Sequence, residues 1–477
     1  MSQPSTVPQV GKDPNIQEPT RPGTSMKYLG GRPFYQYLFA YTIAGMFLFS
    51  CYSAIPGILL PNQVQMVEFQ AYFGDYPHVT SEVLQQLASG TYTGPDAAEL
   101  TDIYNHYDGA RASAMSVVSA VGSLFTMFAQ PIVGVISDRW RSRWGRRSFW
   151  ICAGGFVGAL LMIGLRYSTT ILLITIFWVV AQVALNFMQA PLVTTIADRT
   201  PENRLATVSA FSGIGTMIGG LAGSLVAGNA FNAMGLDAYY IFAILVAFGA
   251  ACFVLLAKDR SSKDLELPRF DVKTFIIGFT IALRDRDYRW VWFARLLMFL
   301  GYTSSTTFNL YVLQSYVRPA LTQAEANAMV PILSLVAMPG MIIMMLVSGR
   351  LSDKLGRRKP FVIYSSFALM ALYALPAVWP TVASLLIMSA LSGFAFGAFM
   401  TVDQALFIDV LPDPEAAGRD LGVANAATNI GQMLAPVIAG QLVARIAGAA
   451  GYRMIYVFAM AMLLLAALAI YPVKKVK

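Results

Sequence analysis

Long apolar stretches, separated by polar segments, follow one another along almost the whole chain. A membrane-spanning helix needs about 20 mostly apolar residues. Twelve stretches satisfy this requirement, roughly at residues 34–60, 111–137, 148–166, 169–197, 204–230, 237–257, 289–314, 327–351, 360–378, 381–409, 420–446 and 453–473. Six lie before residue 258 and six after residue 288, so the pattern predicts two bundles of six helices, at 34–257 and 289–473.

The polar segments predict the connections between these bundles. Residues 1–33 are rich in Pro, Gly and Thr and are expected to form a disordered tail. Residues 61–110 are expected to form a long outer loop, with a short helix at 81–87. Residues 258–288 are expected to link the bundles, with an amphipathic part at 272–283 lying along the inner membrane surface. Residues 474–477 form a second, short tail.

Composition and charge identify the class of protein. Hydrophobic residues make up 56% of the chain and charged residues 13%, whereas soluble domains carry about 25% charged residues. Of the 34 Lys and Arg residues, 28 fall in the tails and on one side of the predicted spans. The positive-inside rule therefore predicts a multi-pass protein of the cell (inner) membrane with both termini in the cytoplasm. This topology accounts for the net charge of +8, so no nucleic-acid partner is expected.

The cysteines and histidines give no sign of a disulfide framework or a metal site. Cys51, Cys152 and Cys252 each lie in a different apolar stretch and are expected to be small buried residues. His78 and His106 lie near acidic residues in the segment 61–110, but their spacing matches no metal-ligand pattern. We expect no metal and no cofactor.

One motif occurs twice, each time between two apolar stretches. The first copy is Gly134-x-x-x-Asp138-Arg139 followed by Gly145-Arg146-Arg147, and the second is Gly349-x-x-x-Asp353-Lys354 followed by Gly356-Arg357-Arg358. The offset between copies is 215 residues at the aspartates and 211 at the later arginines, and Asp198 and Asp409 keep the offset of 211. A register held over this length indicates an internal duplication, which is common among secondary transporters.

This motif is the signature of the major facilitator superfamily, which the chain resembles over nearly its whole length. The resemblance implies an all-α membrane protein with twelve transmembrane helices in two pseudo-symmetric six-helix bundles around a central cavity. Two segments, residues 137–147 and 402–412, further resemble the sucrose-type and glycoside–pentoside–hexuronide cation symporters. The implied function is secondary active transport by alternating access.

The motif also implies a gate. By resemblance, Asp138 faces the start of the eleventh span, Asp353 faces the start of the fifth, and the later arginines pair with acids at the ends of the fourth and tenth spans. The expected gating residues are Gly134, Asp138, Arg139, Arg146, Arg147, Asp198, Gly349, Asp353, Arg357, Arg358 and Asp409. The alternative, that these arginines only set the topology, explains neither the fixed Gly and Asp positions nor their duplication.

Polar side chains recur at helical spacing inside several apolar stretches. Inside a membrane such groups face protein or water. The candidate solute-binding residues are Tyr37, Tyr41, Gln182, Asn186, Gln189, Tyr302, Thr306, Asn309, Gln404, Asn425 and Asn429. The alternative is hydrogen bonding between helices, worth about 0.6 kcal/mol each. Because the stripes fall on spans that line the cavity in the resembled family, a polar cavity is the favoured interpretation.

Two charges lie well inside apolar stretches. Asp403 precedes Asp409 by six residues and Arg295 follows Arg289 by six, so each lies about 9 Å from the end of its span. A charge at mid-helix costs about 2.5–3.5 kcal/mol on insertion scales. Equal depth and opposite sign predict an ion pair, with Asp403 as the carboxylate for proton coupling. The alternative is a static structural pair.

Taken together, these observations predict a proton-coupled symporter of a small polar solute, such as a sugar, that works as a monomer. The expected partners are this solute, a proton or other cation, and the lipid bilayer. An exporter of a hydrophobic compound is the alternative. A membrane-integral enzyme or sensor is a minor alternative, because no histidine lies in an apolar stretch and no cluster of acids and thiols is visible.

Overall fold

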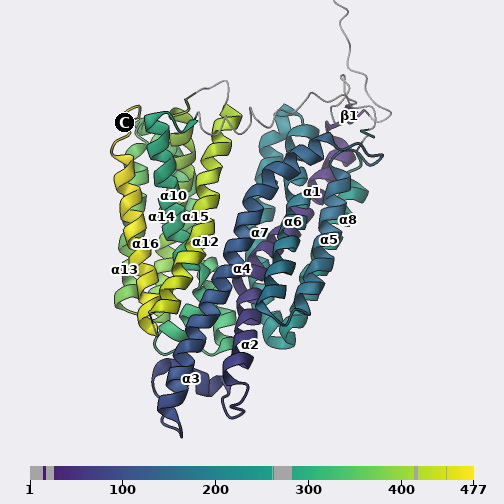
Figure 1. The fold of residues 1–477 in the computed structure, drawn as a ribbon. Helices are drawn as coiled ribbons and strands as arrows, with labels where there is room; N and C mark the ends of the chain where they lie inside the picture. Colours follow the sequence, from purple (N-terminus) through teal and green to yellow (C-terminus); the bar gives the residue numbers. More distant parts are fainter. Residues whose placement is uncertain are drawn as a thin grey trace, which may run out of the picture. The chain divides into compact units, whose positions relative to one another are not determined.

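A computed structural model describes residues 14–17, 26–259, 261–262, 282–412, 417–446 and 448–476 (Figure 1). The chain divides into two compact units. The first unit comprises Met1–Leu59 and Phe125–Phe270, and the second comprises Leu60–Leu124 and Asp271–Lys477. The second unit therefore contains part of the predicted N-terminal bundle, because residues 60–124 pack against C-terminal segments.

The first unit is built around α1 (Gly31–Ala54). This helix packs against α7 (Leu205–Met234) and α8 (Ala238–Leu256), while α5 (Ser148–Arg166) packs against α6 (Ile171–Arg199) and α8 (Figure 1). Small residues allow the close approach of α1 and α7, since a Cβ added to Gly223 would lie 2.5 Å from Ser50 Cα. The Thr170 hydroxyl caps the start of α6 by accepting a hydrogen bond from the Leu173 N–H.

Part of the predicted disordered tail is ordered. Strand β1 (Ile16–Gln17) pairs antiparallel with β2 (Lys27–Tyr28), and the first helix begins at Gly31 rather than at residue 34. The Tyr28 side chain donates a hydrogen bond to the Lys258 carbonyl oxygen over 2.5 Å and stacks on Tyr37. These contacts, which the polar composition of the tail does not suggest, hold the segment before α1 in place.

The second unit contains the remaining long helices. α12 (Gln323–Leu355) packs against α14 (Val382–Asp409), and α13 (Lys359–Val378) packs against α14 and α16 (Ala449–Ile470). α10 (Arg286–Thr307) packs against α15 (Ala417–Arg445) and α16. It continues through α11 (Asn309–Tyr311) into a π-helix, η4 (Val312–Tyr316).

The stretch 61–110, predicted to be a loop, is largely helical. α1 continues through a π-helix, η1 (Ile55–Leu59), into α2 (Leu60–Phe73). α3 (Ser81–Ser89) follows, two residues longer than the predicted helix at 81–87, and α4 (Ala97–Arg139) begins 14 residues before the predicted span. Apolar side chains from these helices form a buried cluster whose members include Phe73, Val79, Leu87, Leu100, Tyr104 and Tyr107. Burial of this apolar surface is the physical reason for the added helices.

Nine segments of the described chain are long and apolar enough to cross a membrane. One of them, Glu202–Leu256, contains both α7 and α8, with 3-10 helices η2 (Glu202–Arg204) and η3 (Gly235–Asp237) before and between them. α10 and α15 are further long helices that carry more polar residues. Helices are thus present at all twelve predicted spans, which confirms an all-α membrane protein. The predicted amphipathic part at 272–283 lies almost entirely outside the described residues.

Candidate functional site

The loop of each motif copy contains a glycine that no other residue replaces without strain. Gly145 has φ +87° and Gly356 has φ +59°, both in the left-handed region. At Gly145 a second restriction applies, because an added Cβ would lie 2.6 Å from the Cβ of Asp259. The glycine of each Gly-Arg-Arg sequence therefore turns the chain from one helix into the next.

In the first copy, Arg147 links two carboxylates. Its Nη1 lies 2.6 Å from Asp138 Oδ1 and its Nε lies 3.1 Å from Asp198 Oδ2. Arg146 Nη2 lies 2.9 Å from the same Asp198 oxygen. The Arg147 side chain is only 4% exposed, and its Nη1 also donates to the Ser137 hydroxyl at 2.9 Å. The predicted pairing of these arginines with Asp198 is present.

In the second copy, Arg358 makes the corresponding contacts. Its Nη2 lies 3.4 Å from Asp353 Oδ1, and its Nη1 lies 3.2 Å from Asp409 Oδ1. Arg357 is exposed, as is Arg139 in the first copy. The two ion pairs of Arg147 are thus repeated by Arg358, together with the sequence motif.

The two motif glycines within helices differ in their surroundings. A Cβ on Gly349 would lie 3.1 Å from Thr401 Cγ2 of α14. Among the described residues, a Cβ on Gly134 would meet no atom within 4 Å. α12 and α14 therefore approach closely at Gly349, and the gating role of both glycines stays a prediction.

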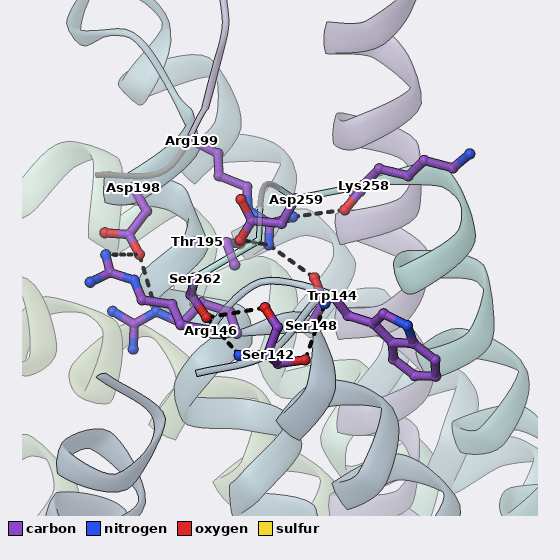
Figure 2. A network of polar contacts seen from close by, with 12 residues as sticks. Ser142, Trp144, Arg146, Ser148, Thr195, Asp198, Arg199, Lys258, Asp259 and Ser262 are labelled. Atoms are coloured by element: carbon purple, nitrogen blue, oxygen red, sulfur yellow. Dashed lines mark hydrogen bonds and ion pairs between the residues drawn. The ribbon is translucent and has the colours of Figure 1, made fainter. Parts of the chain in front are cut away.

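Behind the first loop lies a second polar network, which the sequence did not reveal (Figure 2). Arg199 Nη2 lies 2.9 Å from Asp259 Oδ2 and 3.1 Å from the Ser148 hydroxyl, and both side chains of the ion pair are at most 3% exposed. The Ser262 hydroxyl donates to the Trp140 carbonyl and accepts from the Ser142 N–H at 2.9 Å. This network fastens the segment after α8 to the motif loop. The only sequence signal for it was Arg199 beside Asp198 at a helix end.

The predicted intramembrane pair is present in the second unit. Arg295 Nε and Nη2 of α10 both lie 2.6 Å from Asp403 Oδ2 of α14. The side chains are 6% and 2% exposed. Arg295 Nη2 also donates to Gln404 Oε1 at 3.1 Å, and its guanidinium lies 4.1 Å from the centre of the Phe407 ring. The other carboxylate oxygen, Asp403 Oδ1, is buried and has no hydrogen-bond partner among the described residues.

The C-terminal segment holds the start of the helix that carries Arg295. The backbone N–H groups of Lys474 and Lys475 donate to Asp287 Oδ2 at 3.0 and 2.6 Å. Burial raises the pKa of Asp285, but hydrogen bonds from Lys475 Nζ and from the Tyr288 and Asp287 N–H groups outweigh it, so the pKa lies below its usual value. Asp285 thus stays ionised and caps α10.

Most candidate solute-binding residues of the first unit form hydrogen bonds with other side chains of the same unit. The Tyr37 and Tyr41 hydroxyls lie 3.1 Å from the Thr195 and Ser212 hydroxyls, and both rings are buried. Gln182 Oε1 accepts a hydrogen bond from the Thr126 hydroxyl at 2.8 Å. Asn186 is buried, with an Oδ1 that lacks a hydrogen-bond partner in the described chain, and Gln189 is half-buried.

The candidates of the second unit are more open. Gln404 and Asn425 are exposed, and Tyr302, Thr306, Asn309 and Asn429 are half-buried. The Tyr302 ring stacks on Phe396 with 4.0 Å between ring centres. Each unit thus carries part of the predicted polar set, and a common cavity between them stays a prediction.

Two polar features lie in the segment predicted to be a loop. Asp108 and Arg111 form a buried ion pair with an Nη2–Oδ1 distance of 2.6 Å, which sequence reasoning missed. The histidines are not part of a metal cluster: no group of three or more His, Cys, Asp or Glu that could hold a metal ion is found in the described ranges.

Comparison with known proteins identifies the family. The family model described as MFS/sugar transport protein matches residues 87–452. The chain belongs to this family. A search of curated protein sequences found no match. The transporter is therefore a multi-pass membrane protein that moves small solutes by secondary transport, and not an enzyme.

Solved structures show the same fold. The nucleoside transporter NupG is 16% identical, with a TM-score of 0.65 over 92% of this chain and 100% of that chain. A bacterial homolog of the human lysosomal transporter Spinster, in an inward-facing and unoccupied conformation, is 14% identical, with a TM-score of 0.60 over 93% and 98%. The peptide transporter POT in complex with sulfate is 12% identical, with a TM-score of 0.61 over 92% and 94%.

Proposed function

We propose that this transporter is a proton-coupled symporter of a polar, hydroxyl-rich solute such as a sugar, and that Asp403 carries the proton. The observation that supports it best is the buried pair of Asp403 and Arg295. The carboxylate is 2% exposed, meets one cation, and has one oxygen without a partner among the described residues. A static structural pair gains stability by satisfying both oxygens, so a half-satisfied carboxylate favours a group that changes its protonation state.

The proposed cycle follows from this geometry. A proton from the outer solution binds Asp403, the carboxyl becomes neutral, and Arg295 loses its counter-ion. Arg295 Nη2 is already 3.1 Å from Gln404, which is exposed, so the released guanidinium is placed to bind solute hydroxyls beside that amide. Release of the proton on the inner side restores the pair and weakens the solute contact.

The class of solute follows from the side chains near this pair. Gln404, Asn425 and Asn429 supply amides, and the stacked rings of Tyr302 and Phe396 supply an apolar face. Amides and aromatic faces suit a neutral solute with many hydroxyl groups. The family description names sugar transport, and the similar structure of NupG is that of a nucleoside transporter, whose solute contains a sugar.

The duplicated ion pairs are proposed to form the inner gate. Both motif loops lie on the side that carries 28 of the 34 basic residues, so we place these loops and both termini in the cytoplasm of a cell-membrane protein. In this proposal Asp138 and Asp353 help to hold the inner side closed, and the transporter is expected to work as a monomer.

The deciding experiment is uptake into proteoliposomes. Labelled sugars and nucleosides are screened under an imposed inward proton gradient, with Asp403→Asn as the variant and Asp102→Asn, an exposed residue outside the pair, as the control. Accumulation of a sugar or nucleoside that needs the gradient and is lost only in Asp403→Asn supports the proposal. Accumulation that ignores the proton gradient overturns it.

A further inference from the structure

Asp108 and Arg111 lie at the centre of a buried polar cluster in the second unit, in which every donor of Arg111 has an acceptor. Arg111 has five N–H donors. Its Nε donates to Asp108 Oδ1, and its Nη2 donates to the same oxygen and to the Ser315 hydroxyl. Its Nη1 donates to the Oε1 atoms of Gln65 and Gln314. Tyr107 and Tyr311 lie over the guanidinium, with ring centres 5.1 and 4.5 Å away. Arg111 is 3% exposed and Asp108 is 1% exposed.

The cluster joins segments that are far apart in the sequence. Asp108 Oδ1 also accepts hydrogen bonds from the hydroxyls of Ser315 in η4 and Tyr452 in α16, both at 2.9 Å. The Tyr104 hydroxyl lies 2.7 Å from that of Ser315. In addition, Gln85 Nε2 of α3 donates a hydrogen bond to the Ala320 carbonyl oxygen at 2.6 Å. Residues of α3 and α4 are thus fastened to η4, to Ala320 and to α16.

The chemistry of the two sides is unequal. Both charges, Asp108 and Arg111, lie on α4 three residues apart, so they stay paired if α4 moves away. The groups on the opposite side, Gln314, Ser315 and Tyr452, are all neutral. Separation therefore exposes no lone charge and breaks only hydrogen bonds that water can replace, whereas a cluster split between an acid and a base would leave two uncompensated charges. A contact of this kind can open and close repeatedly.

The backbone in this region also has features that favour a contact able to open and close. α4 approaches α15 through small residues: a Cβ on Gly440 would overlap the Ser116 hydroxyl, and a Cβ on Gly109 would lie 3.3 Å from Ala444 Cα. η4 is a π-helix, a type often found at functional sites, and η1 in the first span is another. The first of the two segments that make up the first unit ends at Leu59, the last residue of η1, so one of the passages of the chain between the units lies at a π-helix.

We propose that these residues form an outer latch, with Asp108 and Arg111 of α4 on one side and Gln314, Ser315 and Tyr452 on the other, which holds the outer side closed and releases when the transporter opens outward. The inference rests on the proposed topology, which places this end of α4 at the outer face. It assigns Ser315 and Tyr452 a positioning role in transport, separate from solute binding and from proton coupling at Asp403.

The test measures distances in the full-length transporter in lipid nanodiscs. Spin labels are placed at Gln86 of α3 and Val378 of α13, which are both exposed, and which lie on opposite sides of the latch. Tyr452→Phe and Ser315→Ala each remove hydroxyl bonds to a charged group. Because such a bond contributes about 1.5–3 kcal/mol, the population at the long label distance should rise at least about tenfold relative to that at the short distance in each variant.

Matched controls come from α16 and from α10, the helix that precedes η4. Tyr456 of α16 is buried and its hydroxyl has no hydrogen-bond partner in the described chain. The Ser304 hydroxyl of α10 donates to the carbonyl of Leu300 in its own helix. Tyr456→Phe and Ser304→Ala should leave the distances unchanged. If Tyr452→Phe and Ser315→Ala also leave them unchanged, the cluster is a static scaffold and the latch is wrong.

The measurement also separates the latch from the proposed function. It uses neither solute nor a proton gradient, so the distance shift is expected even if Asp403 does not carry the proton. Loss of gradient-driven uptake in the proteoliposome screen, with the distance shifts intact, overturns the symport proposal alone. Lower melting temperatures in Tyr452→Phe and Ser315→Ala without any distance shift overturn the latch alone.

Discussion

Arg147 and Arg358 occupy equivalent positions in the two halves of the chain. Each guanidinium lies between the aspartate of its motif copy and an aspartate at the end of a long helix, with Asp138 and Asp198 around Arg147 and Asp353 and Asp409 around Arg358. The two sets are not equal in strength. Arg147 is 4% exposed and lies 2.6 Å from its motif aspartate, whereas Arg358 is 24% exposed and lies 3.4 Å away.

This asymmetry predicts unequal effects of neutralising the motif aspartates. Asp138→Asn should slow transport about tenfold, because it removes a close partner of a buried arginine. Asp353→Asn should slow it about threefold or less, since exposed pairs contribute only about 0.2–1 kcal/mol. Solute binding in detergent should stay within a few-fold of wild type in both, because neither aspartate is among the candidate binding residues. Binding and vesicle transport are measured together, and unchanged transport in both variants would remove the motif from the gate.

The two loop glycines offer a matched test of backbone strain. Both Gly145→Ala and Gly356→Ala force a left-handed alanine, which costs about 1–2 kcal/mol. Gly145→Ala also pushes against Asp259 and disturbs its buried pair with Arg199, and breaking a buried pair costs about 3–5 kcal/mol. The apparent melting temperature in detergent should therefore fall more for Gly145→Ala. Gly422→Ala, at an exposed position in α15 with no close neighbour among the described atoms, should not lower it. Equal losses at Gly145 and Gly356 would contradict the role given to Asp259.

The sequence predicted the features that depend on simple physical rules. Bilayer thickness fixes the length of an apolar helix, so the twelve spans were found, although α4 is longer than predicted. A charge inside a membrane needs a partner at its own depth, so Arg295 and Asp403 were matched correctly. Duplication placed Asp198 and Asp409 at equal offsets, and both meet the expected arginine.

What the sequence did not predict depends on contacts between distant and mostly neutral residues. The outer latch brings Arg111 to Ser315 and Asp108 to Tyr452, and neither hydroxyl carries a charge that would indicate a partner. The seven acids of the segment 61–110 suggested a solvated loop and masked its apolar spacing. The hydroxyls of Tyr37 and Tyr41 were assigned to solute, but helix spacing alone does not show that Thr195 and Ser212 lie beside them.

The topology is tested by thiol labelling on intact cells. In a background that lacks Cys51, Cys152 and Cys252, cysteine is introduced at Gln86 in α3 or at Ser261 after α8, both exposed positions. Ser262 is unsuitable because it is 5% exposed and hydrogen-bonded to the motif loop. The 28 basic residues predicted inside lead us to expect that an impermeant reagent labels Gln86→Cys only. Labelling of Ser261→Cys without Gln86→Cys would reverse the topology.

The coupling role of Asp403 predicts a split between two kinds of transport. Asp403→Asn should abolish accumulation against a gradient, because an amide neither binds nor releases the proton. Downhill exchange should continue, since the amide resembles the protonated carboxyl, the form in which the loaded transporter changes conformation in the proposed cycle. If Asp403→Asn still carries protons in step with solute, measured by a pH dye inside vesicles, the proton travels on another group.

A double-mutant cycle then decides whether Arg295 acts through Asp403. Arg295→Gln alone leaves a buried carboxylate without its cation, a change that costs about 3–5 kcal/mol in buried pairs. Arg295→Gln together with Asp403→Asn leaves two neutral groups that can hydrogen-bond to each other, so the double variant should be more stable than Arg295→Gln and should exchange solute faster. The interaction energy from the cycle should exceed about 1 kcal/mol, because residues in direct contact couple by about 0.5–3 kcal/mol. Additive effects would mean that the 2.6 Å contact does not link the two residues in function, and the coupling mechanism and the static ion pair would both be wrong.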